Sequence, residues 1–258
     1  MNAFYISLII ASVILLISAF IYFTFFYPTV KKVLKDCSEN FKYKETYENI
    51  PKVIFITYKD KKILKKLKNK WQKLNPKYKI EIYDNKDCEK YLYEKFSSEH
   101  MEIFKKIKHG PIKGDYFRAH RMKKGGIYVD ADVSPFNVDP YSNLFVIPYS
   151  RFAHLTNPTL IIAPPNHPFI LQTIKAYKIV IEKIRYGYWR WSIVTITAQL
   201  NKINVHKIPR ILQEFSPFGN RNDYLIFVYD VKNGKKVFNN RVQEYDPRKH
   251  EFKHSKQF

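Results

Sequence analysis

After residue 50 the chain shows two different patterns of apolar and polar positions. Short runs rich in β-branched and aromatic residues predict buried strands at residues 51–57, 78–83 and 127–129. Between these runs apolar residues recur every three or four positions, which predicts helices at about 63–74, 88–96, 99–107 and 112–124. This succession of strands and helices predicts an α/β domain with a mostly parallel sheet.

Fewer elements are predicted in the second half of the chain. Residues 168–184 have one apolar stripe, which predicts a helix, and residues 224–229 are typical of a late strand. Asn233-Gly234 behind that strand favours a hairpin turn. Between the third and fourth helices, His109-Gly110-Pro111 is interpreted as a loop.

The N-terminal residues differ from the rest of the chain. Residues 3–26 are 24 positions without a charge, long enough to cross a bilayer as a tilted helix. A cleaved signal peptide would have a basic start, a shorter apolar core and a small-residue cleavage site, so an uncleaved anchor is the preferred interpretation. We therefore expect a transmembrane anchor at 1–27, a charged stem at 28–49 and one large domain at 50–258.

The formal net charge of +22 indicates a surface that favours anions such as nucleotides, phosphates, acidic lipids or nucleic acid. An alternative is that Lys, Asn, Ile, Tyr and Phe are abundant together because their codons are AT-rich. Lysines are densest in residues 59–73, where eight stand against one Asp. This helix face is interpreted as solvated, with contact to an anionic membrane or an acceptor as the alternative. Cys37 and Cys88 allow at most one disulfide, so the redox compartment stays undecided.

The strongest chemical signal is the stretch Gly125-Gly126-Ile127-Tyr128-Val129-Asp130-Ala131-Asp132-Val133. Two glycines permit a tight turn out of the preceding helix, a strand follows, and two carboxylates stand at its carboxyl end. Open α/β sheets hold their ligands at that end. On an extended chain Asp130 and Asp132 would point to the same side and offer oxygen ligands to a divalent cation.

Asp115 and Arg118 share one face of the helix that precedes this strand. An exposed ion pair at this spacing is common and adds about 0–1 kcal/mol. Because the helix runs directly into the strand with two carboxylates, a place in the site is favoured over a surface pair. There Arg118 could hold phosphate or sugar oxygens, and Asp115 could accept a hydrogen bond from a sugar.

Together these residues resemble a known family. Gly114-Asp115-Tyr116-Phe117-Arg118, then Met122, then the stretch from Gly125 to Val133, is similar to the signature of the DXD-containing glycosyltransferases of family 32. That family includes initiation-specific α-1,6-mannosyltransferases and lactosylceramide galactosyltransferases. Further similar segments at Ile50–Ile54 and Thr156–Pro168 extend the resemblance over about residues 50 to 172.

The resemblance implies a GT-A fold, with a Rossmann-like sheet that binds a nucleotide-diphospho-sugar. It also implies a hexosyltransferase that moves a hexose from a UDP- or GDP-sugar to a glycan, glycoprotein or glycolipid hydroxyl, with retention. Mn²⁺ or Mg²⁺ would be held by Asp130 and Asp132, and these two with Asp115 and Arg118 would form the catalytic site. Donor contacts are implied for Asp115, Arg118, Asp130, Thr57 and Tyr58, and no nucleic-acid partner is expected.

The chain departs from the family pattern at both ends of the domain. Phe55-Ile56-Thr57-Tyr58 stands where the family usually has His-Gln-Thr-Trp. The C-terminal His of the family, which is followed by Gly-Ser-Trp, has only His250 and His254-Ser255 as counterparts. His254 is the candidate third metal ligand, and the alternative is a solvent-exposed histidine in a lysine-rich tail.

The resemblance also bears on location. An anchor followed by a stem is similar to type II transferases of Golgi or ER membranes, which hold the catalytic domain in the lumen. Lys31, Lys32 and Lys35 follow the span and no Lys or Arg precedes it, so the positive-inside rule predicts a cytoplasmic domain. Both orientations stay open for this single-pass membrane protein.

Two other functions compete with glycosyl transfer. One is a haloacid-dehalogenase-like phosphohydrolase, which also ends a strand with Asp-x-Asp. In that fold the strand lies near the start of the domain and an acidic pair follows later, whereas about 80 residues of this domain precede Asp130 and no Asp-Asp or Glu-Asp pair follows. The other is a non-catalytic, membrane-anchored basic module that binds glycans or polyanions, in which the paired carboxylates would have no role.

Overall fold

The computed structural model describes residues 11–18, 46–108, 110–150, 155–156, 158–183, 212–215, 226–230, 234–240, 245–246 and 251–252. The chain divides into two units, Met1–Phe41 and Lys42–Phe258. In the first unit residues 11–18 are helical. Among the described residues, no helix has the length and apolar character that a bilayer crossing requires. Most of the expected anchor lies outside them, so the anchor stays a prediction.

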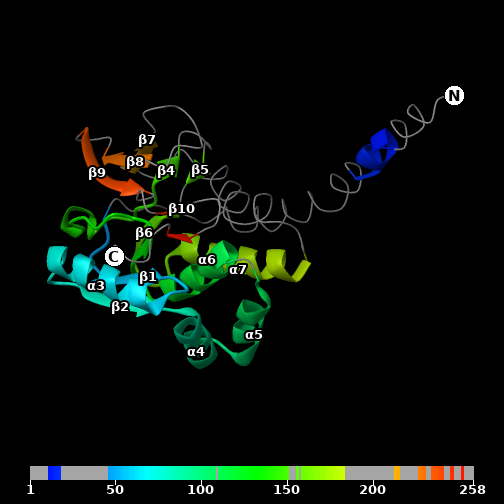
Figure 1. Cartoon of the computed structure of the whole chain (residues 1–258), viewed down its shortest axis with the longest axis horizontal. Helices are drawn as coiled ribbons and strands as arrows, with labels where there is room; N and C mark the ends of the chain where they lie inside the picture. The colour runs from blue at the N-terminus through cyan, green and yellow to red at the C-terminus, as the bar shows by residue number, and fades with distance from the viewer. Residues whose placement is uncertain are drawn as a thin grey trace. The chain divides into compact units, whose positions relative to one another are not determined.

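A four-stranded sheet forms the centre of the second unit (Figure 1). Its order is β2 (Lys79–Tyr83), β1 (Val53–Thr57), β3 (Gly126–Asp130) and β6 (Leu160–Ala163). β1 is parallel to β2 and to β3, whereas β6 is antiparallel to β3. The prediction of an α/β domain with a mostly parallel sheet is therefore confirmed for this sheet.

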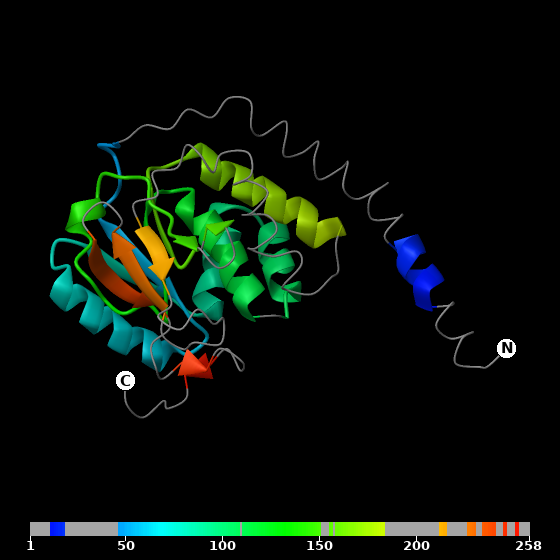
Figure 2. The same cartoon turned by 90° about the horizontal axis from the view of Figure 1, so that it is seen from above.

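Helix α3 (Lys61–Leu74) covers one face of this sheet (Figure 2). The side chain of Asp60 begins the helix by accepting hydrogen bonds from the backbone N–H groups of Lys62 and Ile63 at 2.7 and 3.3 Å. The predicted apolar stripe is buried against the sheet, apart from Leu74 at its exposed end; the buried members are Ile63, Leu64, Leu67 and Trp71. Ile54, Ile56, Ile127 and Val129 join the same apolar cluster.

Three helices pack near the opposite face: α4 (Asn85–Lys95), α5 (Ser98–Lys106) and α6 (Gly110–Met122). An aromatic layer fills the contact, with Tyr83, Tyr91 and Phe117 at ring separations of 5.0 to 5.8 Å. Within this layer the buried Arg121 donates to Glu81 at 2.9 Å and lies over the ring of Phe55 at 4.7 Å. Alternation along β1 therefore separates an apolar face at Ile54 and Ile56 from an aromatic and ionic face at Phe55.

A second, mainly antiparallel sheet was not predicted from the sequence. Its order is β5 (Leu155–Thr156), β4 (Tyr149–Ser150), β7 (Leu212–Phe215), β8 (Ile226–Asp230) and β9 (Lys235–Asn240). Phe238 of β9 stacks on Phe136 at 4.8 Å, and this contact joins the second sheet to the apolar cluster under α3. The remaining elements are the short 3-10 helix η2 (Asp139–Tyr141), α7 (Pro168–Lys183), β10 (Tyr245–Asp246) and β11 (Glu251–Phe252).

Most predicted elements are confirmed within a few residues. The helix predicted at 168–184 is α7, and the strand predicted at 224–229 is β8, which pairs antiparallel with β9 after a turn containing Gly234. The interpretation of Gly110 and Pro111 as loop residues was wrong, because α6 begins at Gly110. Proline fits the first turn of a helix, where its missing N–H has no partner to lose.

Gly125 and Gly126 make the turn from α6 into β3. Both have positive φ, 71° and 111°. A Cβ on Gly125 would lie 2.6 Å from the backbone nitrogen of Pro165, and one on Gly126 would lie 2.9 Å from the carbonyl oxygen of Val53. Both positions therefore need glycine for backbone conformation and for space.

We predict that Gly125→Ala lowers the free energy of unfolding by about 1–3 kcal/mol, because the new Cβ combines a strained φ with a backbone clash. Denaturant unfolding followed by circular dichroism measures the change. Gly110→Ala is the matched control, since nothing lies within 4 Å of its Cβ position. Equal unfolding midpoints for the two variants would contradict this account of the turn.

A histidine pair is enclosed where α5 meets α6. His120 is fully buried, and its Nδ1 lies 2.7 Å from the carbonyl oxygen of Tyr116, so that nitrogen carries the hydrogen and donates. Its Nε2 lies 3.0 Å from Nδ1 of His100. Burial lowers the pKa of His120 from 6.5 to about 3.

This histidine makes stability depend on pH. Above pH 6.5 His120 is neutral in both the folded and the unfolded chain. Between pH 6.5 and 3 it is protonated in the unfolded chain but stays neutral in the folded chain. We therefore expect stability to fall as the pH drops from 6.5 towards 3, by up to about 1.4 kcal/mol per pH unit from this group. His120→Gln should give a shallower fall in melting temperature between pH 6.5 and 5 than the wild type. Parallel curves would contradict the prediction.

Candidate functional site

Three parallel strands end at the same edge of the sheet. Thr57, the last residue of β1, pairs in register with Tyr83 at the end of β2 and with Asp130 at the end of β3. The N-terminal half of α6 also approaches this edge, because a Cβ on Gly114 would lie 3.8 Å from Oγ1 of Thr57. The carboxyl ends of β1 and β3 and one helix thus converge where α/β sheets bind ligands.

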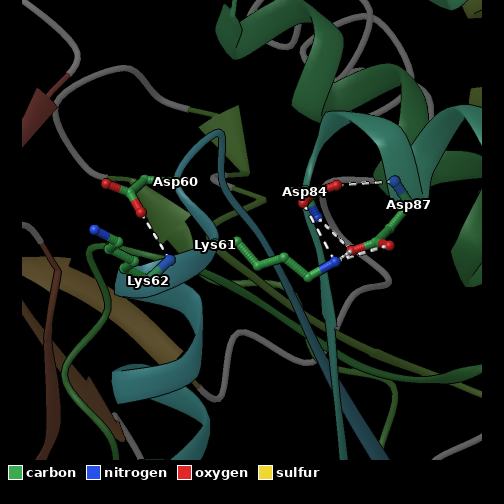
Figure 3. A network of polar contacts seen from close by, with 5 residues as sticks. All are labelled: Asp60, Lys61, Lys62, Asp84 and Asp87. Carbon is green, nitrogen blue, oxygen red and sulfur yellow. Dashed lines mark hydrogen bonds and ion pairs between the residues drawn. The ribbon is translucent and has the colours of Figure 1, made fainter.

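The starts of α3 and α4 are linked at this edge (Figure 3). The ammonium of Lys61 donates to both carboxylate oxygens of Asp87 at 2.9 and 3.1 Å and lies 3.3 Å from Oδ2 of Asp84. Asp84 caps α4 through a reciprocal capping box with Asp87. This network holds the loops after β1 and β2 next to one another.

Asp115 and Arg118 form a buried ion pair and not the exposed pair that is common at their spacing. The two side chains are 5% and 4% exposed, and Nη2 of Arg118 donates to Oδ1 of Asp115. The other terminal nitrogen, Nη1, donates to the carbonyl oxygen of Pro158 at 2.9 Å and to Oδ1 of Asp130 at 3.3 Å. One guanidinium therefore joins α6 to the end of β3 and to the segment before β6.

Asp130 is the more accessible carboxylate, with 30% of its side chain exposed. Its Oδ1 accepts hydrogen bonds from Arg118 and from the hydroxyl of Tyr128. Within the described part of the chain, no hydrogen bond reaches its Oδ2. That oxygen is available to a ligand.

Sequence reasoning missed two contributors to this arrangement. Tyr128 was assigned only to the strand, yet its ring lies under the Arg118 guanidinium at 4.8 Å and its hydroxyl contacts Asp130. Residues 128 and 130 are two apart on β3, so alternation along a strand was the signal that places both side chains on one face. The carbonyl of Pro158 gives no comparable signal, because its contact depends on how β6 returns along β3.

Burial governs the charges at the site. It raises the pKa of Asp115 from 3.8 to about 7, with the guanidinium of Arg118 opposing that rise and the carboxylate of Asp130 adding to it. Burial raises the pKa of Asp130 as well, again against the effect of Arg118. Burial thus disfavours the charged forms of Asp115 and Asp130, and a cation bound beside them would stabilise those forms.

The geometry expected for Asp132 was wrong. β3 ends at Asp130, and residues 131–132 form a turn in which the N–H of Val133 donates to the carbonyl oxygen of Asp130 at 3.1 Å. Asp132 is therefore a half-buried turn residue and not part of an extended chain. Asp130 itself still pairs in register with Thr57 of β1, and its N–H donates to the carbonyl oxygen of Thr159 at 2.8 Å, one residue before β6. The extended backbone therefore ends directly after Asp130.

The carboxylates suit a hard divalent cation. Asp130 has an oxygen without a hydrogen bond, Asp132 lies two residues away, and the buried Oδ2 of Asp115 has no hydrogen-bond partner among the described residues. In that part of the chain, no group of three or more His, Cys, Asp or Glu side chains is arranged to hold a metal. Mg²⁺ is commonly bound by one or two carboxylates together with substrate phosphates and water, so a two-carboxylate set fits it.

The other predicted site residues are placed less closely. Thr57 lies at the same edge as Asp130, and the half-buried Tyr58 follows it, with its N–H donating to the carbonyl oxygen of Tyr83 at 3.2 Å. Donor contacts by these two residues stay a prediction. His250 and His254 lie outside the described residues.

Residues 61–139 match the family described as "Glycosyltransferase sugar-binding region containing DXD motif". The matched segment contains Asp115, Arg118, Asp130 and Asp132. Solved structures similar to this chain include one titled "PaToxG Glycosyltransferase", with 19% identity, a TM-score of 0.44, and coverage of 67% of this chain and 74% of that chain. No curated protein sequence matches the chain. The family match supports a glycosyltransferase, and glycosyl transfer as the general class of reaction is confirmed at that level.

We predict that Arg118→Met lowers the free energy of unfolding by about 3–5 kcal/mol, because it leaves buried carboxylates without their counter-charge. Urea unfolding at pH 8 measures the loss. Asp115→Asn in the same chain should restore part of it by removing one of the unpaired charges.

The matched control is another acid–base pair at the same helical spacing, Glu102 and Lys105, which are 51% and 44% exposed. Lys105→Met should change stability by less than about 1 kcal/mol. An equally small effect of Arg118→Met would show that Arg118 does not hold the site together.

Proposed function

We propose that this chain is a metal-dependent hexosyltransferase that moves a hexose from a UDP- or GDP-sugar to a hydroxyl of a glycan, glycoprotein or glycolipid. The observation that carries the proposal is the buried bridge from Asp115 through Arg118 to Asp130. This bridge lies inside the segment that matches the sugar-binding region. It leaves carboxylate oxygens available at the carboxyl edge of a parallel sheet, where a nucleotide-sugar fits.

Asp130 and Asp132 are the residues that would hold Mn²⁺ or Mg²⁺ together with the donor diphosphate. When bound, the ion supplies positive charge to the diphosphate as it leaves the sugar. The chain itself contributes the position of Asp130, since Arg118 and Tyr128 both donate to Oδ1 and, among the described residues, Oδ2 accepts no hydrogen bond. The pKa of Asp130, raised by burial, would fall in the presence of a bound cation.

Asp115 is proposed to accept a hydrogen bond from a hydroxyl of the donor sugar. Its Oδ2 is buried and has no partner among the described residues, a state that costs free energy unless a ligand donates to it. Arg118 is proposed to position the two carboxylates, because its donors already face Asp115, Asp130 and Pro158 and its side chain is nearly inaccessible. A direct contact between Arg118 and phosphate is thus the less favoured role.

Several finer features belong to the same proposal. We propose a GT-A type of nucleotide-sugar fold, membership of glycosyltransferase family 32 and retention at the anomeric carbon. The mostly parallel sheet and the family match support the fold, whereas family and stereochemistry rest on the sequence resemblance. Anchorage through residues 1–27 and a Golgi- or ER-type membrane location rest on the sequence alone.

The proposal is tested with the full chain in neutral detergent, incubated with Mn²⁺ or Mg²⁺ and a panel of UDP- and GDP-sugars while released nucleotide is measured. We expect one donor to be hydrolysed or transferred in the presence of metal. Asp130→Asn and Asp132→Asn should each lower that rate by about 10²-fold or more, because each removes a charge from the metal and diphosphate contact.

Glu102→Gln is the control, since it removes a carboxylate charge from an exposed position on α5 and should leave the rate unchanged. If no donor in the panel is bound or turned over, the proposal is overturned. It is also overturned if a donor is turned over and both aspartate variants act on it as fast as the wild type.

A further inference from the structure

The outer face of α3 is the most strongly charged surface among the described elements. The helix has seven lysines and no acidic residue in 14 positions. Lys62, Lys65, Lys66 and Lys73 recur at spacings of three, four and seven, so they lie in one row opposite the buried stripe at Ile63, Leu64, Leu67 and Trp71. All four lysine side chains are exposed.

This row is not neutralised by its neighbours. The nearby acids act elsewhere, since Asp60 caps the helix and Asp84 and Asp87 pair with Lys61 (Figure 3). No ion pair is formed by Lys62, Lys65, Lys66 or Lys73 within the part of the chain that the structure describes. Like charges three and four residues apart oppose helix formation, so an external anion would relieve a repulsion already present in the fold.

We propose that this face of α3, the lysine row, binds the surface of an anionic phospholipid bilayer. From Lys62 to Lys73 the row is about 17 Å long and straight, which suits a flat array of headgroups. Juxtamembrane lysines gain attraction from anionic lipids without inserting apolar side chains. The row contains no large apolar residue, so adsorption and not insertion is the mode that fits.

Nucleic acid is a poorer match to the same surface. Proteins that read a nucleic-acid sequence or bind single strands combine basic residues with base-reading side chains or with aromatic rings on which bases stack, whereas lysines alone give sequence-independent phosphate contacts. Among the exposed residues of α3 there is neither arginine nor an aromatic side chain, because Trp71 is buried under the helix. A separate, sequence-based argument for lipid is the uncharged segment at residues 3–26, which is expected to keep the domain near a bilayer.

The proposed contact would orient the site. α3 begins next to the edge that holds Thr57 and ends near the opposite edge of the sheet, and it lies along one face (Figure 2). With the lysine row on a bilayer, the sheet lies above the surface and its carboxyl edge opens along the membrane plane. If the proposed glycosyl transfer is correct, an acceptor carried by a membrane lipid would be presented to Asp130 from the side.

The test measures lysine reactivity in the full chain reconstituted into phosphatidylcholine nanodiscs, with and without phosphatidylserine. An amine-reactive acetylating reagent and mass spectrometry give the rate at each lysine. We expect Lys62, Lys65, Lys66 and Lys73 to react at least about fivefold more slowly in the anionic discs, and about 0.5 M NaCl to abolish the difference. If the chain does not insert into nanodiscs, it is mixed with vesicles of the same two lipid compositions, and the acetylation rate of each lysine is measured in the same way.

Lys95, Lys106 and Lys108 are internal controls, since they are exposed and lie in or directly after the helices on the other face of the sheet. Equal protection of these lysines would indicate general attraction to a basic protein and would overturn the proposal. Unchanged reactivity of the lysine row would overturn it too. A further arm adds RNA or heparin to the chain in phosphatidylcholine discs. If these polyanions slow the reaction of the lysine row more than phosphatidylserine does, the lipid proposal is overturned in favour of a soluble polyanion.

A charge-matched pair of variants gives a second measurement. Lys62→Gln/Lys65→Gln/Lys66→Gln should restore the reactivity of Lys73 in anionic discs, whereas Lys95→Gln/Lys106→Gln/Lys108→Gln should leave Lys73 protected. Equal behaviour of the two triple variants would count against the lysine row. None of these readings requires turnover, so failure of lipid binding and failure of the glycosyltransferase proposal are separate results.

Discussion

The guanidinium of Arg118 holds together three segments: α6, the end of β3, and Pro158 before β6. Burying an arginine costs free energy unless its N–H groups have hydrogen-bond acceptors. If any one of these segments moved away, the guanidinium would lose an acceptor, so the position of each segment depends on the others. The ring of Tyr128 adds a flat surface beneath the guanidinium and a hydroxyl directed to Asp130. Placement of the candidate site is therefore a consequence of satisfying one buried charge.

The rest of the sheet separates this ionic arrangement from the main apolar cluster. Alternation along β1 sends Ile54 and Ile56 towards α3 and Phe55 towards the helices on the other side. One face can then be packed with aliphatic side chains, while the other holds Arg121, Glu81 and the aromatic layer. The outer face of α3 is left free of any packing requirement, and for this reason it can carry a row of like charges.

Predictions from the sequence were most accurate where local physics decides the outcome. The periodicity of α3, the strand ending at Asp130 and the need for glycine before it all follow from residues close together in the chain. The pairing of Asp115 with Arg118 was expected from helical spacing, but its burial was not. The second sheet was missed because its strands are short and come from separated segments, and the turn at Asp132 was missed because an Asp-x-Asp pattern does not show where a strand stops.

The sequence by itself determined which residues are candidates for the chemistry: the carboxylates after a buried strand, the acid and guanidinium on the preceding helix, and the lysines opposite an apolar stripe. It could do so because spacing along one strand or one helix places side chains on a common face. Only the tertiary structure decided that Arg118 serves two carboxylates at once, that Tyr128 supports Asp130, and that Oδ2 of Asp115 is buried without a partner among the described residues. These are properties of contacts between segments, and desolvation at such contacts depends on packing that no single segment contains.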